Sequence, residues 1–454
     1  MLLHDAIHTY HDLLTDELAG ETQARLDEQL RLRGLFFGER PLCTVLRPRF
    51  MTAEQYRFLQ ERSRIVLRAF GKAYQAALQD KAFRAQFGLL DWEEELLRHD
   101  PGFRDPSPTS RLDSFFVTEQ VELRFTEYNA ETPAAPAYNE SLTELFCGLP
   151  VMREFLRRYE LRPLPARHGV LHALLDAFQQ WGGRSERPRI AILDWREVPT
   201  YSEFVLFEEY FKSQGLECII ADPRDLEYRD GRLMAGDFHI TLIYKRVLIS
   251  ELIDREGLDH AVVRAVRDGA VCMVNPFRCK ILHKKASLAV LSDERNAGLF
   301  TGDELKAIHD HIPWTRRVEE RRTEFHGQSL DLIPLLYERR EQFVLKANDE
   351  YGGKGIVLGW EAEPGDWERA VQAALAEPHV AQERVTLPSE PYPGLTDEGT
   401  VQFIDRMLDT DPFVFYGDYV DGCLTRLSTA TLLNVTAGGG STVPTFIVRS
   451  RQEG

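Results

Sequence analysis

The sequence predicts a mixed α/β protein with α+β elements, and three patterns along its 454 residues carry that prediction. Residues 1 to about 100 have the apolar spacing of helices. From Pro188 onward, short apolar strands alternate with a helix, which is the βαβ pattern. Near residue 342, two apolar strands flank a glycine-rich loop.

The first part of the chain is predicted to be helix, hairpin and helix. The expected elements are a helix at 53–85, strands at 111–117 and 121–130, and a helix at about 138–158. The turn of the hairpin is placed near Gln120. Pro133 and Pro136 end the hairpin, because proline cannot continue a strand ladder and favours the start of a helix.

The middle of the chain predicts a small open α/β lobe. Its expected elements are strands at 189–194 and 216–221, a helix at 202–214, a hairpin at Asp230-Gly231 and a strand at 240–244. Ligands of such sheets bind beyond the carboxyl ends of the strands, which singles out Asp194, Lys245 and Arg246. The alternatives are a helix cap for Asp194 and flanking surface charge for the two cations.

The last part of the chain alternates strand and helix. A strand at 342–346 precedes the glycine loop, a helix follows near 366–375, and Val380 to Glu383 form a further strand. Backbone groups along Gln382, Glu383 and Val385 suit the edge of an adenine ring, with Leu345 and Val357 expected to flank it. An ordinary exit from a strand, ended by Pro388, is the alternative.

Oxygen-bearing side chains gather on one face of the predicted hairpin. With the turn near Gln120, Asp113 lies opposite Glu127 and Arg111 opposite Asn129. Two facing carboxylates destabilise each other unless a cation lies between them, and carboxylates with an amide oxygen suit Mg²⁺. A solvated hairpin neutralised by its own arginines is the alternative. Glu131 is expected to bind an amine or to cap the turn before Pro133.

The glycine loop predicts a phosphate site. It runs from Gly352 through Gly353 and Lys354 to Gly355, directly after a strand that contains Lys346. Glycines let backbone N–H groups approach phosphate oxygens, and the lysines supply positive charge. The spacing fits neither a Walker A loop nor a dinucleotide-binding fingerprint. A hairpin turn with an incidental lysine is the alternative.

Together these blocks resemble the circularly permuted ATP-grasp ligases of the glutathionylspermidine-synthase-like group. The R-x-D and E-Y-N-A-E-T-P blocks, Lys284-Lys285-Ala286, the V-L-K strand with its glycine loop, Gln382 to Pro388 and the run from Tyr416 to Pro444 occur in the family's order, over about residues 105–450. The resemblance implies an ATP-grasp fold with a pre-ATP-grasp α/β lobe, preceded here by a helical region. The implied units are 1–105 (helical), 106–165 (metal-binding hairpin segment of the ATP-grasp core), 166–285 (pre-ATP-grasp lobe) and 286–454 (nucleotide-binding lobe).

The resemblance also implies an activity and a site. It implies an ATP- and Mg²⁺-dependent ligase that joins a small-molecule or peptide carboxylate to an amine through an acyl phosphate. Arg111 is the implied catalytic residue, and the metal ligands are Asp113, Glu127 and Asn129. The implied ATP contacts are Lys285, Lys346, Gly352, Gly353, Lys354, Gly355, Gln382, Glu383 and Val385. Further substrate or phosphate contacts are Glu131, Asp194, Arg246, Arg426 and Asn434.

Departures from the family pattern leave the substrates open. Lys284 stands where the family has asparagine, the loop reads G-G-K-G rather than G-R-E-G, and the family's aromatic-Pro-His ending is absent. A phosphotransferase, a ligase that attaches an amino acid to a peptide or protein, and a non-catalytic nucleotide-binding protein are the alternatives.

Composition is that of a globular enzyme. The formal net charge is −17, which argues against nucleic acid or an anionic membrane as the main partner. Six cysteines are scattered without C-x-x-C spacing, so neither zinc nor a disulfide framework is expected. The start lacks the features of a signal peptide, and a cytoplasmic location is expected. Composition says nothing about the oligomeric state.

Overall fold

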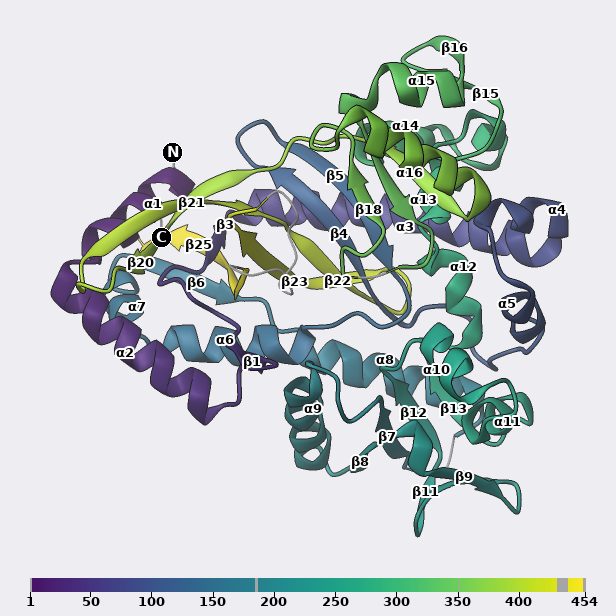
Figure 1. Ribbon diagram of the computed structural model, residues 1–454. Coiled ribbons are helices and arrows are strands. Elements are labelled where there is room, and N and C mark those ends of the chain that lie inside the picture. Colours follow the sequence, from purple (N-terminus) through teal and green to yellow (C-terminus); the bar gives the residue numbers. More distant parts are fainter. Residues whose placement is uncertain (1, 184–186, 351, 431–439, 452–454) are drawn as a thin grey trace.

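The computed structural model describes residues 2–183, 187–350, 352–430 and 440–451, and its centre is one long antiparallel sheet. The strand order is β20-β21-β23-β22-β4-β5, and β24 pairs with β23 beside this path. The strands are β4 Thr109–Val117, β5 Glu122–Asn129, β20 Ser389–Leu395, β21 Val401–Leu408, β22 Asp411–Phe415, β23 Tyr419–Ser428 and β24 Ser441–Val443. Strands from both ends of the chain therefore build one sheet (Figure 1).

The β4–β5 hairpin has the register that the sequence predicts. Arg111 pairs with Asn129, and Asp113 pairs with Glu127. A bulge follows directly, because the register shifts between Asp113 and Ser114. The bulge bends the strand at the point where the two carboxylates face each other.

The helical N-terminal region covers one end and one face of this sheet. Its helices are α1 Leu2–Leu13, α2 Asp16–Leu32, α3 Ala53–Gln79, α4 Lys81–Arg84 and α5 Asp91–Leu96, with the short strands β1 Phe36–Phe37 and β2 Arg40–Pro41 between them. Thr52 and Gln55 form a capping box that starts α3. The predicted helix at 53–85 is interrupted at Asp80, which has extended backbone angles and caps α4 instead.

The second predicted helix, 138–158, is also two helices. They are α6 Pro136–Cys147 and α7 Pro150–Phe155, separated by Gly148 and by Pro150, which takes the first helical position. Close by, a three-stranded sheet of β3 Arg49–Met51, β25 Thr445–Ser450 and β6 Tyr159–Pro163 brings distant parts of the chain together, with β25 in the middle. Its β3 runs parallel to β25.

The α/β lobe has the predicted open sheet, with order β13-β12-β7-β8 and all pairs parallel. Its elements are β7 Arg189–Leu193, β8 Glu217–Ala221, β12 Leu242–Lys245 and β13 Cys272–Val274, with α8 Arg167–Trp181, α9 Tyr201–Ser213, α10 Ile249–Glu256 and α11 Ala261–Arg267. The predicted hairpin at Asp230-Gly231 joins β9 Leu226–Arg229 to β10 Arg232–Ala235, and β11 Phe238–Ile240 follows.

A third lobe, here called the loop lobe, carries the glycine loop. Its sheet has the order β14-β19-β17-β18, and it packs against helices at the upper right of Figure 1. The elements are α12 Lys280–His283, α13 Ala286–Ser292, α14 Gly302–His311, β14 Thr315–Arg317, β15 Arg322–Phe325, β16 Gln328–Asp331, α15 Leu332–Glu338, β17 Phe343–Ala347, β18 Ile356–Leu358, α16 Pro364–Ala376 and β19 His379–Glu383. A separate apolar core fills the lobe.

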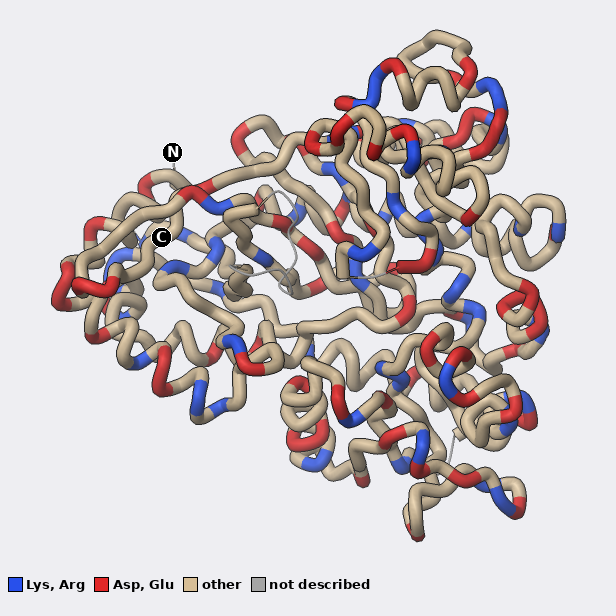
Figure 2. The backbone as a smooth tube through the Cα atoms, viewed as in Figure 1, with Lys and Arg blue, Asp and Glu red and all other residues tan. Residues whose placement is uncertain are grey.

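Acidic and basic positions are interspersed along the chain in the view of Figure 2, so the charge of −17 is spread over the lobes. Among the described residues, none of the helices combines the length and the apolar character that a bilayer crossing requires.

A buried carboxylate joins the hairpin to the two neighbouring lobes. Glu131 follows β5, and its Oε1 accepts hydrogen bonds from Ile249 N (2.6 Å) and Lys245 Nζ (3.2 Å) of the α/β lobe. Its Oε2 accepts from Lys280 Nζ (3.1 Å) of α12. Burial raises the pKa of Glu131, but Lys280 and Lys245 outweigh it and hold the pKa well below its usual range. Glu131 is therefore a buried anion between two ammonium groups.

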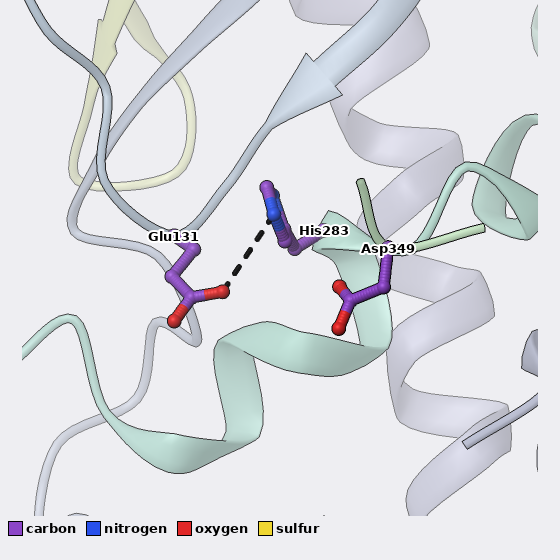
Figure 3. Close-up of side chains that lie close together, drawn as sticks. All are labelled: Glu131, His283 and Asp349. Carbon is purple, nitrogen blue, oxygen red and sulfur yellow. Dashed lines mark ion pairs between the residues drawn. The ribbon is translucent and has the colours of Figure 1, made fainter. Parts of the chain in front are cut away.

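The same junction contains a histidine and a second carboxylate. Figure 3 shows Glu131, His283 and Asp349 side by side, with His283 Nε2 3.6 Å from Glu131 Oε2. Lys280 Nζ lies 2.7 Å from both oxygens of Asp349. Burial lowers the pKa of His283 to about 4, so the ring is neutral at pH 7. The oxygens of this group already bind ammonium protons, which makes it an ion-pair junction rather than a metal site.

We predict that Glu131→Gln destabilises the protein by about 3–5 kcal/mol, because it leaves two buried ammonium groups without their shared anion. Urea unfolding at pH 7 measures this loss. The folded-state pKa of Glu131 lies below its unfolded value, so its contribution is present above about pH 4.3 and is lost as the pH falls further. The gap between wild type and variant should therefore narrow in acid.

Glu119→Gln is the matched control, because Glu119 is exposed in the turn of the same hairpin. Equal unfolding free energies for Glu131→Gln and Glu119→Gln at pH 7 would contradict the structural role of the junction.

Candidate functional site

A cavity of about 810 Å³ lies between the long sheet and the sheet of the loop lobe. One wall comes from β4, β5 and the segment between β21 and β23, and the other from β17, β18 and β19. Its charged and polar lining includes Asp113, Thr126, Glu127, Lys346, Gln382, Glu383, Asp409, Asp411 and Arg426. The structure thus brings together residues that are about three hundred positions apart in the sequence.

Glu127 faces two lysines across the cavity. Lys285 Nζ donates to Glu127 Oε1 (3.1 Å) and to the backbone oxygen of Glu350 (2.6 Å), next to the glycine loop. Burial raises the pKa of Glu127, but Lys285 and Lys346 more than offset that and lower it. The carboxylate is ionised at neutral pH and can bind a cation that enters the cavity.

Lys346 lies on β17 with its ammonium group inside the cavity. Its Nζ donates to Gln382 Oε1 (2.7 Å) and to the backbone oxygen of Thr126 (3.3 Å). Burial lowers the pKa of Lys346 to about 8, against an opposing contribution from Glu127. An anion that binds beside Lys346 would stabilise its charged ammonium form, which burial has destabilised.

Asp113 is held by two arginines. Arg111 binds it through both carboxylate oxygens at 2.7 and 2.9 Å, and Arg426 Nη2 adds a contact of 2.8 Å. Burial raises its pKa, but Arg111 and Arg426 hold the pKa of Asp113 below its usual range. Arg111 is buried and is not among the residues that line the cavity, whereas Arg426 lines it.

Two further carboxylates, Asp409 and Asp411, surround Arg426 and were missed by the sequence interpretation. Arg426 Nε contacts Asp409 at 2.5 Å, and its Nη2 contacts Asp411 at 2.9 Å. Burial raises the pKa of both, and Asp113 raises the pKa of Asp411 further. Two aspartates two residues apart at the start of a strand, with a basic residue on the next strand, are the signal that predicts this cluster.

The glycine loop adopts backbone angles that side chains disfavour. Gly352, Gly353 and Gly355 have φ values of 64°, 81° and 66°. A Cβ on Gly355 would lie 2.8 Å from the Cβ of Ala347, so the position also lacks room. These glycines and Lys354 follow β17 and are not among the residues that line the cavity.

The strand that ends at Glu383 forms the second predicted wall. Gln382, Glu383 and Val385 all line the cavity, and Glu383 Oε1 lies 2.8 Å from His326 Nε2. The apolar lining contributed by β17 and β18 is Val344, Ile356 and Leu358. The prediction that Leu345 and Val357 flank the cavity is wrong by one residue on each strand, because alternate side chains face the core of the loop lobe.

Three predicted contacts lie elsewhere, at the junction with the α/β lobe. Glu131 accepts hydrogen bonds there from Lys245, Ile249 and Lys280. Arg246 donates to the backbone oxygen of Pro133 and lies 3.7 Å from Glu203. Burial raises the pKa of Asp194, at the end of β7, to about 7. Asn434 lies outside the described residues.

Glu127 and Asn129, on β5, fit a magnesium ion better than Asp113, on β4. Glu127 has one lysine contact and a partly exposed side chain, and Asn129 lies on the same face of β5. Asp113 already accepts three guanidinium hydrogen bonds, which leaves its oxygens less available to a cation. Both ligand types suit a hard cation.

Comparisons with known proteins identify the fold. No protein-family model and no curated protein sequence matches the chain. Among solved structures, it is similar to a glutathione synthetase-like effector from Globodera pallida in its apo form, with a TM-score of 0.59 and 11% identity over 96% of this chain and 98% of that one. A RimK domain ATP-grasp protein from Sphaerobacter thermophilus has a TM-score of 0.27 and 15% identity, over 57% of this chain and 90% of that one, which is too low to bear on the fold.

The first likeness spans nearly the whole of both chains. The protein is a mixed α/β chain whose overall fold is similar to that of a glutathione synthetase-like effector.

Proposed function

We propose that this protein is an ATP-dependent ligase that joins a carboxylate to an amine. One observation carries the proposal: a single cavity is lined by the ionised carboxylate of Glu127 and by Lys346, by an apolar slot beside a strand edge, and by an arginine surrounded by aspartates, while Lys285 contacts Glu127. These are the parts needed to bind Mg-ATP at one end and a charged substrate at the other.

The nucleotide is assigned to the side formed by the loop lobe. Val344, Ile356 and Leu358 offer an apolar surface to the base, and the backbone at Val385 lies at its edge. Lys346 and Lys285 lie where phosphates would follow, and the positive φ angles of the glycine loop suit backbone N–H groups that turn toward phosphate oxygens. Glu127 and Asn129 would hold Mg²⁺, which neutralises phosphate charge when bound.

The aspartate–arginine cluster is assigned to the substrates. Three carboxylates face two guanidiniums there, so the cluster favours an additional cationic group such as an amine. In the proposed reaction, an oxygen of the substrate carboxylate bonds to the γ-phosphorus of ATP and the bond to ADP breaks. The amine nitrogen then bonds to the acyl carbon, phosphate leaves, and the amine proton passes to solvent.

Arg426 is assigned a contact with the reacting acyl group, because it lines the cavity beside the aspartates, whereas Arg111 is not among the lining residues and Arg384 lies next to the strand edge assigned to the base. Arg111 is assigned a supporting role through Asp113. Guanidinium groups stabilise the negative charge that develops in both steps.

We expect the protein to release ADP when Mg²⁺, ATP, pooled carboxylates and pooled amines are all present, and to form a product whose mass is that of acid plus amine minus water. Arg426→Lys should lower turnover by about 100-fold while ATP-analogue binding persists, because lysine lacks the planar fork. Coupled ADP detection and mass spectrometry measure both results.

A product that keeps the phosphate would instead identify a phosphotransferase. A mass increment on an added polypeptide would identify a protein- or peptide-modifying ligase. Nucleotide binding without turnover in any pool would contradict the ligase proposal.

We expect Glu127→Gln to remove the Mg²⁺ dependence of nucleotide binding and to weaken Mg-ATP-analogue binding by about tenfold or more, which is about 1.4 kcal/mol. Calorimetric titration with and without Mg²⁺ measures this. Glu122→Gln, at the other end of the same strand, is the control. Asp113→Asn tests whether that carboxylate also binds the ion, and an unchanged Mg²⁺ dependence in Glu127→Gln would contradict the assignment.

We expect nucleotide affinity to fall by up to tenfold per unit as the pH rises above about 8, because Lys346 then loses its proton in the free protein. Bound phosphate raises the pKa of Lys346, so binding at pH 8.5 should take up a proton. Calorimetry in two buffers of different ionisation enthalpy detects this uptake. Lys346→Arg stays charged and should abolish it; uptake that persists in that variant would assign the proton to another group.

A further inference from the structure

A second hollow, of about 870 Å³, lies where the helical N-terminal region, the α/β lobe and the loop lobe meet. Its lining residues Lys81, Glu94 and Arg267 belong to α4, α5 and α11, which are labelled at the right of Figure 1. Four basic side chains line it, and they come from all three parts of the molecule: Lys81, Arg98, Arg267 and Arg317. The proposed function uses none of them.

This positive charge is only partly compensated: Lys81 and Arg98 help to lower the pKa of Glu94, after Arg84, but neither forms an ion pair with it. Of the lining carboxylates, Glu94 accepts hydrogen bonds from Arg84 at 2.9–3.1 Å, and Glu95 lies 3.6 Å from Arg267. Within the described part of the chain, no carboxylate forms an ion pair within 4.0 Å of Lys81, Arg98 or Arg317. Asp91 is the remaining acidic group of the lining. The hollow is therefore suited to an anion with at least two charges.

One wall of this hollow lies against Asn348, a residue between β17 and the glycine loop. Gly88 lines the hollow, and a Cβ placed on it would lie 3.0 Å from Asn348 Nδ2 and 3.9 Å from Arg317 Cζ. Arg317 Nη1 also donates to the backbone oxygen of Ala85 (2.8 Å). The turn at 85–88 thus lies between the basic side chain and Asn348.

Asn348 is buried and uses every polar group it has. Its Nδ2 donates to the backbone oxygen of Phe87 (2.9 Å), and its backbone N donates to Pro378 O (3.0 Å), another residue of the hollow. On its other side, its Oδ1 accepts from Ala286 N and its backbone oxygen accepts from Lys285 N, both at 2.9 Å. Lys285 is the residue that contacts Glu127 in the cavity.

We propose that this hollow binds a small multivalent anion and that Asn348 couples its occupancy to nucleotide binding. An anion that draws Arg317 and Arg98 together fixes the turn at 85–88 and thereby the anchor of Lys285. Nucleotide affinity should then rise. Anion binding stands independently of the proposed function, and only the coupling rests on it.

The binding test uses inorganic phosphate and succinate as separate probes, titrated calorimetrically into protein saturated with Mg²⁺ and a non-hydrolysable ATP analogue, so that the main phosphate site is filled. We expect binding that weakens about tenfold in Arg98→Ala and in Arg317→Ala. Arg232→Ala, an exposed position on β10, should leave it unchanged. A preference for phosphate or for succinate distinguishes a phosphate ligand from a carboxylate one. No binding of either probe, or equal binding to Arg98→Ala, would overturn the anion site.

The coupling test measures nucleotide affinity with and without the bound probe. We expect a rise of about fivefold in wild type and, reciprocally, the same factor for the probe when nucleotide is present. The Asn348→Ala variant should still bind the probe, but the probe should no longer raise its nucleotide affinity. If that variant does not fold, the wild type alone still tests the coupling. A nucleotide affinity of the wild type that is the same with and without the probe would overturn the coupling. Failure of the wild type to bind nucleotide at all would count against the proposed function, and the Arg98 comparison without nucleotide would still report on the hollow.

Discussion

The arrangement of the lobes depends on the buried charge of Glu131. A carboxylate without water is stable only where cations and N–H donors surround it, and here these come from β12, α10 and α12. The end of the hairpin is therefore fixed relative to the α/β lobe and to the chain that leads into the loop lobe. Asn275 adds to this, since its side-chain amide donates to the backbone oxygens of Thr109, Ala130 and Glu131.

With the hairpin fixed, the cavity acquires two ends of different character. On one side, lysines face a single carboxylate, and burial leaves Lys346 poorly stabilised as a cation. On the other, three aspartates crowd two arginines, and burial raises the pKa of Asp409 and Asp411. The first end lacks anions and the second lacks a cation, which is the charge pattern expected where a polyphosphate and an amine meet.

Local patterns predicted much of this from the sequence, because they act over a few residues. Strand period placed Asp113 opposite Glu127, and the register confirms it. The predicted mixed α/β fold class is confirmed, and the likeness to a glutathione synthetase-like effector agrees with the fold that the resemblance implied. The break of the first long helix at Asp80 was not predicted, since a single capping side chain decides it. The engagement of Glu131 was missed because its partners Lys245 and Lys280 lie 114 and 149 positions away, whereas Asp409 and Asp411 were missed although Arg426 follows only 17 and 15 positions later. No spacing rule connects Glu131 to Lys245 or to Lys280.

The three-stranded sheet of β3, β25 and β6 has a consequence for how the chain folds while it is being synthesised. Its middle strand is residues 445–450, whereas its outer strands are residues 49–51 and 159–163. At ordinary rates of translation, β3 waits roughly 20–80 s for its partner to be synthesised. During that time the edge of β3 that pairs with β25 in the structure has no strand partner. The N-terminal part of the nascent chain, which is synthesised first, is therefore the part most exposed to chaperones and to misassembly.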